Sequence, residues 1–420
     1  MVRKGALEVI CPLEIDGRRF LIIRHLSLTN FRNYERLELD LSPHVTVLQG
    51  GNAQGKSNCL EAIYLLATSK SPRATAEREL IHWSAFKDDI PASRLLAEVQ
   101  RVGGNLRLEI ALKASADSSS EGDVYFPQLQ SVKGSAHVQK RIRVNGVARR
   151  AIDLIGQLNV VMFSAEDIDL IIGEPVLRRR YLDITNSQVD HRYLRQLQRY
   201  NRVLWQRNHL LRMIAEKHAR PEELSFWDKE LVESGTYLVA QREHLVASLN
   251  HIIQTIHHGL SDGREELCLV YRGSIGKEIN GLQLEELAEF FERALHISRD
   301  KEIARGVSLV GPHRDDLLFL VNGVDAGVYG SRGQQRTIAL SLKLAEAGFI
   351  KDRVGENPVL LLDDVLSELD ARRRHHVLNS VTRYEQVLLT ATDVDSFEPD
   401  FLAQAALFRV AQGQIEPLSS

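Results

Sequence analysis

Cysteine is scarce in this chain of 420 residues, and the few cysteines are widely separated. Cys11, Cys59 and Cys268 form no C-x-x-C pair, which argues against a metal knuckle or a disulfide framework and favours a reducing compartment. We expect all three to be small buried side chains.

Long apolar runs are also missing. No window approaches the roughly 18 consecutive apolar residues that a membrane-spanning helix requires. The first twenty residues carry Glu8, Glu14 and Asp16 where the apolar stretch of a signal peptide would lie. We therefore expect a soluble, cytoplasmic protein with no membrane partner.

The sequence has no overall excess of basic residues, and few aromatic ones. Its formal net charge is -3, so any contact with nucleic acid must come from local basic patches. Aromatic residues make up only 6% of the chain, which gives no sign of a base-stacking platform and favours contact with a duplex backbone over reading of single strands.

What the chain does have is ordinary globular composition and a length at which one core usually splits. Period-two alternation predicts strands, and the three- and four-residue spacing of Leu60, Ile63, Tyr64 and Ala67 predicts a helix with a buried face. The segments from 164 to 305 have mostly helical patterns, after which strands and glycine turns return. This order indicates a helical lobe inserted into one α/β domain. Strands are predicted at 21–28, 36–41, 45–48, 94–100, 106–112 and 359–362, an Asn-Gly hairpin at 141–150, a linker at 113–123, and helices at 56–68 and from about 332.

The stretch VTVLQGGNAQGKSN, residues 45–58, contains the pattern G-x-x-x-x-G-K-[ST] between a strand and a helix. Glycines let backbone N–H groups close around phosphates, Lys56 reaches the terminal phosphates, and the Ser57 hydroxyl can ligate magnesium. The pattern therefore predicts a nucleotide-binding phosphate loop. Its candidate binding residues are Gly50, Gly51, Asn52, Ala53, Gln54, Gly55, Lys56, Ser57 and Asn58.

A possible partner of this loop lies about 300 residues later, in VLLLDD at 359–364. Four aliphatic residues predict a strand buried on both faces. Asp363 at its end is the candidate magnesium acid opposite Ser57, and Asp364 can orient or deprotonate the attacking water. By itself, such a run is more often a strand that ends at solvent, and the phosphate loop is what favours the magnesium role.

The segment SRGQQR, residues 331–336, precedes a predicted helix. Ser331 is a suitable N-cap, and Gly333 permits close approach of another backbone, so the helix can present N–H groups to an anion. A plain capped helix is the alternative interpretation.

The order of these motifs, followed by Ser367 to Asp370, resembles the ATP-binding-cassette heads of the SMC superfamily and, within it, the RecF family of bacterial DNA replication and repair proteins. The resemblance extends from about residue 21 to 392. It is carried by LSLTNFRNYERLELDL, GGNAQGKSNCLEAIYLLATSKSPR, FSAEDIDLIIGEPVLRRRYLD, GPHRDDLLFLVNG, SRGQQRTIALSLKLAE and VLLLDDVLSELD.

The resemblance implies an α/β fold, a P-loop ATPase head like those of cassette and SMC proteins with an inserted, mostly helical second lobe. The ATPase lobe would comprise residues 21–163 and 306–420, and the inserted lobe residues 164–305. Residues 1–20 precede the usual start of the family and would be a variable extension or the result of a misassigned start.

The resemblance also assigns roles in an ATP and Mg²⁺ site. Lys56 and Asp364 would be catalytic, with Ser57 and Asp363 at the metal. The aspartate at 364, where many cassette ATPases have glutamate, implies weak ATPase activity that serves as a switch. Further nucleotide contacts would come from Arg32 and Asn33, from the signature residues Ser331, Gly333 and Gln334, and from Asp370 of the D-loop. The cassette switch histidine is missing, and Thr390 or Asp393 would have to replace it.

In this superfamily the signature of one subunit covers ATP held by the phosphate loop of the other, which implies an ATP-dependent homodimer. The family is associated with duplex DNA next to single-stranded gaps, with RecR and RecO in the loading of RecA, and with the SOS response. Clustered cations suffice for sequence-independent phosphate contact, although each cluster is more often a solvated face. The candidates are Lys140, Arg141, Arg143, Arg149 and Arg150; Arg178 to Arg180; and Arg372 to Arg374. The arginines at 178–180 could instead cap or pair within the helical lobe.

Other classes stay open at this point. A P-loop enzyme that acts on a small substrate, such as a kinase, accounts for the phosphate loop but leaves the signature and D-loop segments unexplained. A transporter ATPase is disfavoured by the size of the inserted lobe. An SMC-like nuclease is disfavoured because only about 25 residues follow Phe397. Another SMC-like ATPase head is the remaining alternative.

Overall fold

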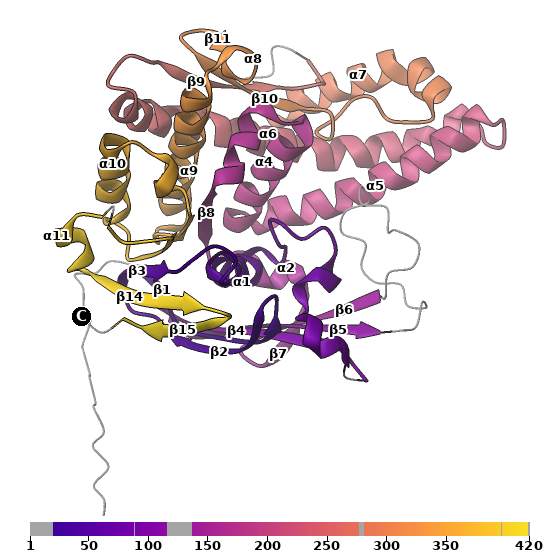
Figure 1. Ribbon diagram of the computed structural model, residues 1–420. Coiled ribbons are helices and arrows are strands. Elements are labelled where there is room, and N and C mark those ends of the chain that lie inside the picture. Colours follow the sequence, from indigo (N-terminus) through magenta and orange to yellow (C-terminus); the bar gives the residue numbers. More distant parts are fainter. Residues whose placement is uncertain (1–19, 88, 116–136, 277–280, 396, 419–420) are drawn as a thin grey trace, which may run out of the picture.

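Three β-sheets organise the part of the chain that the computed structural model describes, which is residues 20–87, 89–115, 137–276, 281–395 and 397–418 (Figure 1). The first sheet has the strand order β2-β1-β4-β5-β6-β7 and is antiparallel throughout. Its strands are β1 (Leu21–Phe31), β2 (Tyr34–Asp40), β4 (Ala92–Arg101), β5 (Gly104–Ser115), β6 (His137–Val144) and β7 (Val147–Arg149). The predicted Asn-Gly turn joins β6 to β7, with positive φ at Asn145 and Gly146.

The second sheet has the order β15-β14-β3-β13-β12-β8 and is parallel except for the edge strand β15. Every residue of β12 and β13 is buried, which confirms the prediction that VLLL forms a strand covered on both faces. Because β13 lies between β3 and β12, it separates the two predicted nucleotide motifs by one strand. The strands are β3 (His44–Gln49), β8 (Val160–Ser164), β12 (Val359–Asp363), β13 (Gln386–Ala391), β14 (Ala405–Ala411) and β15 (Gln414–Pro417).

The helix α1 (Lys56–Thr68) has the predicted bounds, but it is buried on nearly every side rather than on one face. It lies between the first and second sheets, and its apolar residues join the core formed by both (Figure 1). A helix that is apolar almost all round is typical of such a position. The phosphate loop at its N-terminus is therefore held on a rigid base.

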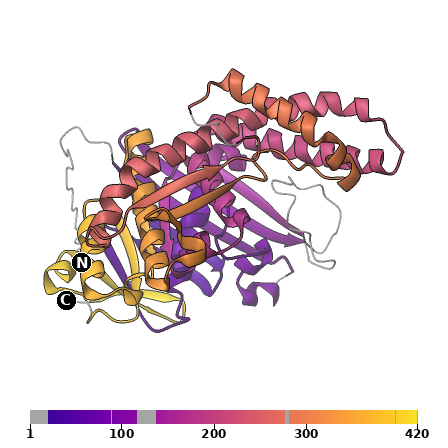
Figure 2. The same ribbon diagram turned by 90° about the horizontal axis from the view of Figure 1, so that it is seen from above.

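Apart from α2, which packs against β6 and α1, the remaining helices cover the other face of the second sheet or form an arm. Figure 2 shows α5, α6 and α7 extending beyond the sheets. The helices are α2 (Ala151–Leu154), α3 (Asp169–Ile172), α4 (Pro175–Val189), α5 (His191–Ala215), α6 (Leu224–Leu260), α7 (Leu284–Arg305), α8 (Ala326–Tyr329), α9 (Arg332–Val354), α10 (Ala371–Val381) and α11 (Pro399–Leu402).

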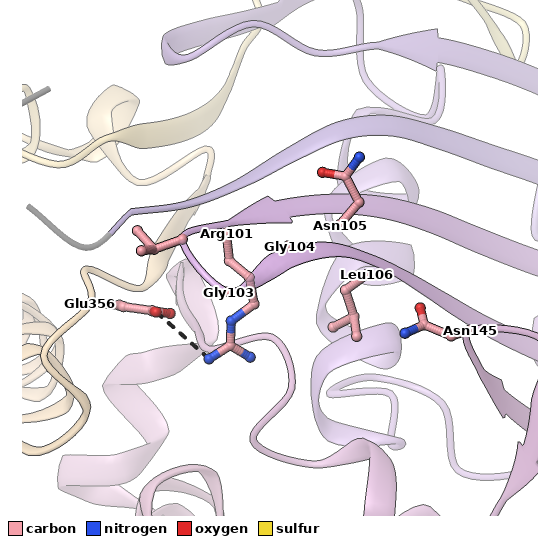
Figure 3. A pocket seen from close by; sticks show the side chains of 8 residues that line it. Arg101, Gly103, Gly104, Asn105, Leu106, Asn145 and Glu356 are labelled. Carbon is pink, nitrogen blue, oxygen red and sulfur yellow. Dashed lines mark ion pairs between the residues drawn. The ribbon is translucent and has the colours of Figure 1, made fainter. Parts of the chain in front are cut away.

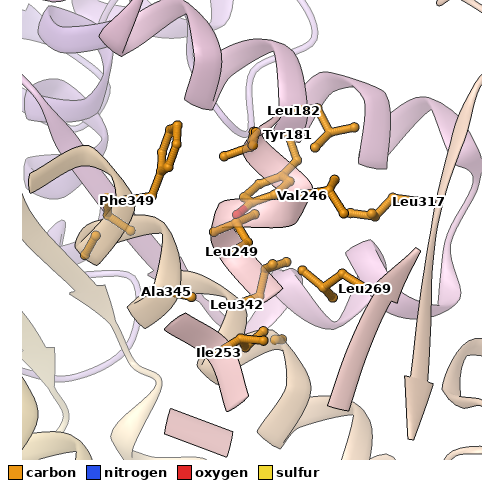
Figure 4. Packing of buried hydrophobic residues seen from close by; sticks show 14 of the residues in the cluster. Tyr181, Leu182, Val246, Leu249, Ile253, Leu269, Leu317, Leu342, Ala345 and Phe349 are labelled. Atoms are coloured by element: carbon orange, nitrogen blue, oxygen red, sulfur yellow. The ribbon is translucent and has the colours of Figure 1, made fainter. Parts of the chain in front are cut away.

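The third sheet, of order β11-β10-β9, packs against α6 of the arm and against α4. β9 (Leu267–Arg272) belongs to the segment expected to be the helical lobe, yet it pairs with β10 (Asp316–Val321), which pairs in turn with β11 (Val324–Asp325). A boundary at 305 would divide this sheet, and the assignment of lobes stays a prediction. Figure 4 shows the shared core, in which Leu249 and Ile253 of α6 pack near Leu342 and Phe349 of α9.

Two remaining expectations from composition have different outcomes. Cys59 is buried, but Cys268 is exposed, so the prediction that all three cysteines are buried is wrong for Cys268. The exposure follows from its place on β9, where alternate residues face away from the core. Cys11, the N-terminal extension and most of the predicted linker lie outside the described residues. Within the described ranges, no helix has the length and apolar character needed to cross a bilayer.

Candidate nucleotide-binding site

The phosphate loop connects the end of β3 to the start of α1, at the carboxyl edge of the parallel sheet, where ligands of open α/β sheets bind. Gly50 lies against β14, and a Cβ atom at this position would be 2.2 Å from the Val410 carbonyl oxygen. Gly55, the N-cap of α1, has φ of 119°, a conformation that favours glycine. Both glycines of the motif are therefore required by the fold of the loop.

The Lys56 side chain folds back over the loop. Its Nζ donates hydrogen bonds to the carbonyl oxygens of Gly50 at 2.5 Å and Gly51 at 2.8 Å. Burial lowers the pKa of the Lys56 ammonium, and the carboxylates of Asp364 and Asp363 oppose this shift. The ammonium is thus held where the loop closes, next to the two acids.

Ser57 at the start of α1 meets Asp363 and Thr390, which lie at the carboxyl ends of the neighbouring strands β12 and β13. Ser57 Oγ donates to Asp363 Oδ1 at 2.7 Å, and Thr390 Oγ1 donates to the same oxygen at 3.0 Å. The fold therefore brings together two motifs that are separated by about 300 residues in sequence. A hydroxyl and a carboxylate at this distance are a donor set that suits Mg²⁺.

Asp364 has an uncommon backbone conformation, with φ of 53°. Its N–H donates to Thr390 Oγ1 at 2.9 Å. Asp364 Oδ1 is buried and accepts no hydrogen bond from the described residues. A buried carboxylate oxygen without a donor is costly, so it indicates a place for a water molecule, an ion or a substrate.

Asn33 and Tyr34 support the loop from behind. Asn33 Nδ2 donates to the Gln54 carbonyl oxygen at 2.9 Å, and its Oδ1 accepts from Asn58 at 2.8 Å. The Tyr34 hydroxyl donates to the Gly55 carbonyl oxygen at 2.9 Å. In this structure Asn33 and Asn58 therefore hold the shape of the loop. The remaining loop residues include Ala53, with φ of 62°, and Asn52, whose carbonyl oxygen accepts from Gln54.

Arg32, expected near the nucleotide, forms an ion pair with the buried carboxylate of Glu61. Its guanidinium donates to both oxygens of Glu61, which is 0% exposed, at 3.0 and 2.7 Å. Arg73 also donates to Glu61 at 3.2 Å, and its guanidinium lies 3.9 Å from Asp363. Sequence reasoning did not identify Arg73, because nothing in its local sequence indicates that it returns to the loop.

The signature segment lies apart from the phosphate loop of its own chain. Ser331 caps α9 as predicted, accepting from the Gln334 N–H at 3.2 Å and donating its own N–H to Gln334 Oε1 at 2.8 Å. Figure 1 shows α8, just before this segment, near the edge of the molecule and well away from α1. A Cβ atom at Gly333 would meet only Ser331 Oγ, at 4.0 Å, so nothing within the described chain requires glycine there.

The D-loop residues have local roles. Ser367 donates to the Asp364 carbonyl oxygen at 2.8 Å, and Asp370 caps α10 by accepting from the Arg373 N–H at 2.9 Å. Of the two candidate switch residues, Thr390 contacts the site, whereas Asp393 is exposed on the following loop.

The predicted basic clusters differ in which side chains are exposed and which form ion pairs or hydrogen bonds within the chain. On the hairpin, Lys140 is paired with Glu77 at 2.5 Å. Arg178 is buried and donates to both oxygens of Asp316, which supports the alternative that it pairs internally. Arg372 pairs with Asp262. The exposed arginines of the hairpin are Arg141, Arg143, Arg149 and Arg150. Within the other clusters, Arg179 and Arg180 donate to backbone carbonyls, Arg373 pairs with Asp370, and Arg374 donates to backbone carbonyls.

A further basic surface lies on α5, and sequence analysis missed it. The helix contains six arginines and no acidic residue. Its outward face is here called the α5 basic face and consists of the exposed residues Arg195, Arg202, Trp205, His209 and Arg212. The signal was present in the sequence as a 25-residue helix without a single carboxylate.

One pocket of the described chain is remote from these motifs. It has a volume of about 460 Å³ and lies at the turn between β4 and β5, where Arg101 approaches Glu356 at 3.6 Å (Figure 3). Its lining contains no residue of the phosphate loop.

Comparison with known proteins identifies the family of the chain. The model of the RecF/RecN/SMC N terminal domain matches residues 22–414. The DNA replication and repair protein RecF of Chloroflexus aurantiacus is 45% identical over 406 residues, covering 94% of this chain and 99% of that protein. A solved structure of the recombination mediator protein RecF with ATP, in the RecFOR pathway, is 30% identical with a TM-score of 0.81, covering 95% of this chain and 98% of the other. The Smc head domain of Pyrococcus furiosus, at 13% identity and a TM-score of 0.50 over 95% of this chain and 97% of that one, shares the fold. The chain therefore belongs to the RecF family of DNA replication and repair proteins.

Proposed function

We propose that this protein binds ATP at the phosphate loop, and that two ATP-bound copies join by placing the signature of each over the nucleotide of the other. The observation that carries this proposal is the separation of α8, which ends just before the signature segment, from α1, which begins at the phosphate loop (Figure 1). Glycine in a helical turn costs up to about 1 kcal/mol relative to alanine. At position 333, no neighbour within the described chain is close enough to require the absence of a side chain. The close approach of a second copy does account for it.

The residues at the loop have the chemistry that this function needs. Lys56 would exchange the Gly50 and Gly51 carbonyls for phosphate oxygens, and the N–H groups at the start of α1 would face the negative charge. Ser57 and Asp363 fit Mg²⁺, and the buried, unpartnered Asp364 Oδ1 fits a site completed by ligands. Bound there, Mg²⁺ would neutralise charge on the phosphates.

We propose that Asp364 orients the attacking water and that hydrolysis is slow. Its backbone N–H is fixed by Thr390, so the position of its carboxylate depends on this hydroxyl. Aspartate has one methylene fewer than glutamate, so it reaches less far toward the terminal phosphate. Slow hydrolysis suits a switch in which ATP holds two copies together and its loss releases them. The comparisons do not favour an enzyme that acts on a small substrate.

We propose that the assembled pair binds duplex DNA next to single-stranded gaps through the α5 basic face and the exposed hairpin arginines. Arg195 and Arg212 are separated by 17 residues, which is about 26 Å along a helix and comparable to several base pairs. α2, which directly follows the hairpin, packs against Leu194 of α5 and brings the two surfaces near one another. In the cytoplasm the protein would act with RecR and RecO so that RecA can load.

The function is tested by sedimentation with ATP, ADP or no nucleotide, with and without gapped duplex DNA. The parent protein is expected to dimerise only with ATP, and Lys56→Ala and Ser331→Arg are expected to stay monomeric and to lose DNA binding. Ser225→Arg places the same charge on an exposed serine of the arm and serves as the control. Dimers formed equally by all four proteins would refute the proposal.

The DNA surface is tested separately by the salt dependence of duplex binding. Arg195→Gln with Arg202→Gln is expected to lower the slope of log K against log salt by about 2, because two phosphate contacts are lost. The control is Lys229→Gln with Lys301→Gln, which removes the same charge from exposed positions elsewhere on the arm. Equal slopes for the two double variants would exclude the α5 basic face.

A further inference from the structure

The signature glutamine is held by a carboxylate that belongs to none of the recognised motifs. Gln334 Oε1 accepts the Ser331 N–H, and Gln334 Nε2 donates to Glu265 Oε1 at 3.0 Å. Because a carboxylate can only accept, Glu265 determines which end of the Gln334 amide faces it. The other end is then left as the acceptor for Ser331, and this orients the start of α9.

Glu265 is supported in turn by a buried histidine. Its Oε2 lies 3.2 Å from His257 Nε2, and His257 Nδ1 lies 2.9 Å from Ser341 Oγ on α9. His257 and Ser341 are both 0% exposed. Burial lowers the pKa of His257, so the ring is neutral and can donate from Nε2 to Glu265. Its Nδ1 lies beside Ser341 Oγ, which also donates to the Thr337 carbonyl oxygen at 2.8 Å. These contacts form a chain from Gln334 to Glu265, then to His257 in the last turns of α6, and back to α9 at Ser341.

The same end of α6 also meets the D-loop helix. Asp262 pairs with Arg372 of α10, and a Cβ atom at Gly259 would lie 2.6 Å from His376 of α10, so glycine permits this contact. α6 has 37 residues and runs from the arm to this point, about 55 Å at the usual helical rise. Both segments expected to touch a second copy thus contact the C-terminal end of α6 or the residues that directly follow it.

We infer that Glu265 is a positioning residue for the signature. Glu265 holds Gln334 and Ser331 in the orientation in which they contact the nucleotide of a second copy, and through His257 it connects them to α6 of the arm. This inference rests on the proposed function, because it assigns Glu265 a role only in the assembled pair. Loss of the carboxylate leaves the Gln334 amide free to turn and leaves His257 Nε2 without its acceptor.

The test compares three variants of the full chain: Glu265→Ala, Glu265→Gln and the control Glu266→Ala. Glu266 is the exposed neighbour, so its replacement removes the same charge one residue away. Each protein is measured for its melting temperature, for binding of a fluorescent ATP analogue to the dilute monomer, and for the dissociation constant of the ATP-dependent dimer.

Glu265→Ala is expected to weaken dimerisation about 10-fold, the scale of one lost hydrogen bond to a charged group, while monomer ATP binding stays within twofold of the parent. Glu265→Gln keeps an oxygen that accepts from Gln334. A change of tautomer at His257 lets Nε2 accept from the amide N–H introduced at position 265. This variant is therefore expected to restore dimerisation. Glu266→Ala is expected to match the parent.

Two results would overturn the inference. One is dimerisation of Glu265→Ala with the affinity of Glu266→Ala. The other is failure of Glu265→Gln to restore dimerisation although its melting temperature equals that of the parent. A parent protein that stays monomeric with ATP would refute the proposed function instead, so the two failures are distinguishable.

Discussion

Glu61 is a fully buried carboxylate beneath the phosphate loop, and Arg32 is its main partner. Replacement of Arg32 by methionine keeps most of the aliphatic stem and removes both charged hydrogen bonds, at 3.0 and 2.7 Å. Ser71 and Arg73 continue to donate to Glu61, so the remaining charge is only partly compensated. The substitution therefore separates two roles for Arg32, support of the loop and contact with the nucleotide.

The expected cost is about 3 kcal/mol in the free energy of unfolding, from two charge-assisted hydrogen bonds at about 1.5 kcal/mol each. Loss of one partner from a buried ion pair has the same scale. For a chain of 420 residues, this corresponds to a fall of about 3 °C in melting temperature. Adding Glu61→Gln should recover about half of the loss, because the uncompensated buried charge is removed. Arg36→Met is the control, since this exposed arginine lies 3.7 Å from Glu38 and should cost under about 0.5 kcal/mol.

The assay is urea and thermal unfolding of the four proteins, combined with titration of a fluorescent ATP analogue. ATP affinity is expected to be restored together with stability in the Arg32→Met and Glu61→Gln double variant. Unchanged stability of Arg32→Met with a tenfold loss of ATP affinity would refute this reasoning and place Arg32 at the nucleotide.

Three further outcomes are expected. Gly50→Ala should lower ATP affinity more than 10-fold in a nucleotide titration, because the new Cβ would lie 2.2 Å from the Val410 carbonyl oxygen and displace the loop; parent-like affinity would contradict this. Thr390→Val should slow ATP hydrolysis about 10-fold by releasing the Asp364 N–H, whereas Thr390→Ser should not; equal rates would exclude this role. Burial lowers the pKa of His313 to about 3, below its unfolded value near 6.5, so the unfolded chain binds the extra proton and stability falls as the pH drops through this window. Between pH 7 and 5 this costs about 2 kcal/mol, and His313→Gln should reduce the loss in unfolding measurements at the two pH values, while an identical loss would argue against it.

Local sequence was sufficient for the elements whose signals are local. The apolar run at 359–362 predicted a strand buried on both faces, and the spacing after Gly55 predicted α1 with its observed bounds. Ser331 was identified as an N-cap, because a capping box is completed within four residues. The phosphate loop was also identified from local sequence. Its glycines are required by the backbone conformation of the loop and by the close approach of another strand.

The sequence by itself therefore determined the phosphate loop, the acids at the end of β12, and membership of the family through the order of the motifs. Only the tertiary structure decided which partner each charged side chain has. Arg32 forms an ion pair with Glu61, Arg178 forms one with Asp316, and Gln334 donates a hydrogen bond to Glu265. These partners are separated by between 29 and 138 residues in sequence. A charge pattern is the same whether a side chain faces solvent or a buried carboxylate, and only the packing of distant elements distinguishes the two.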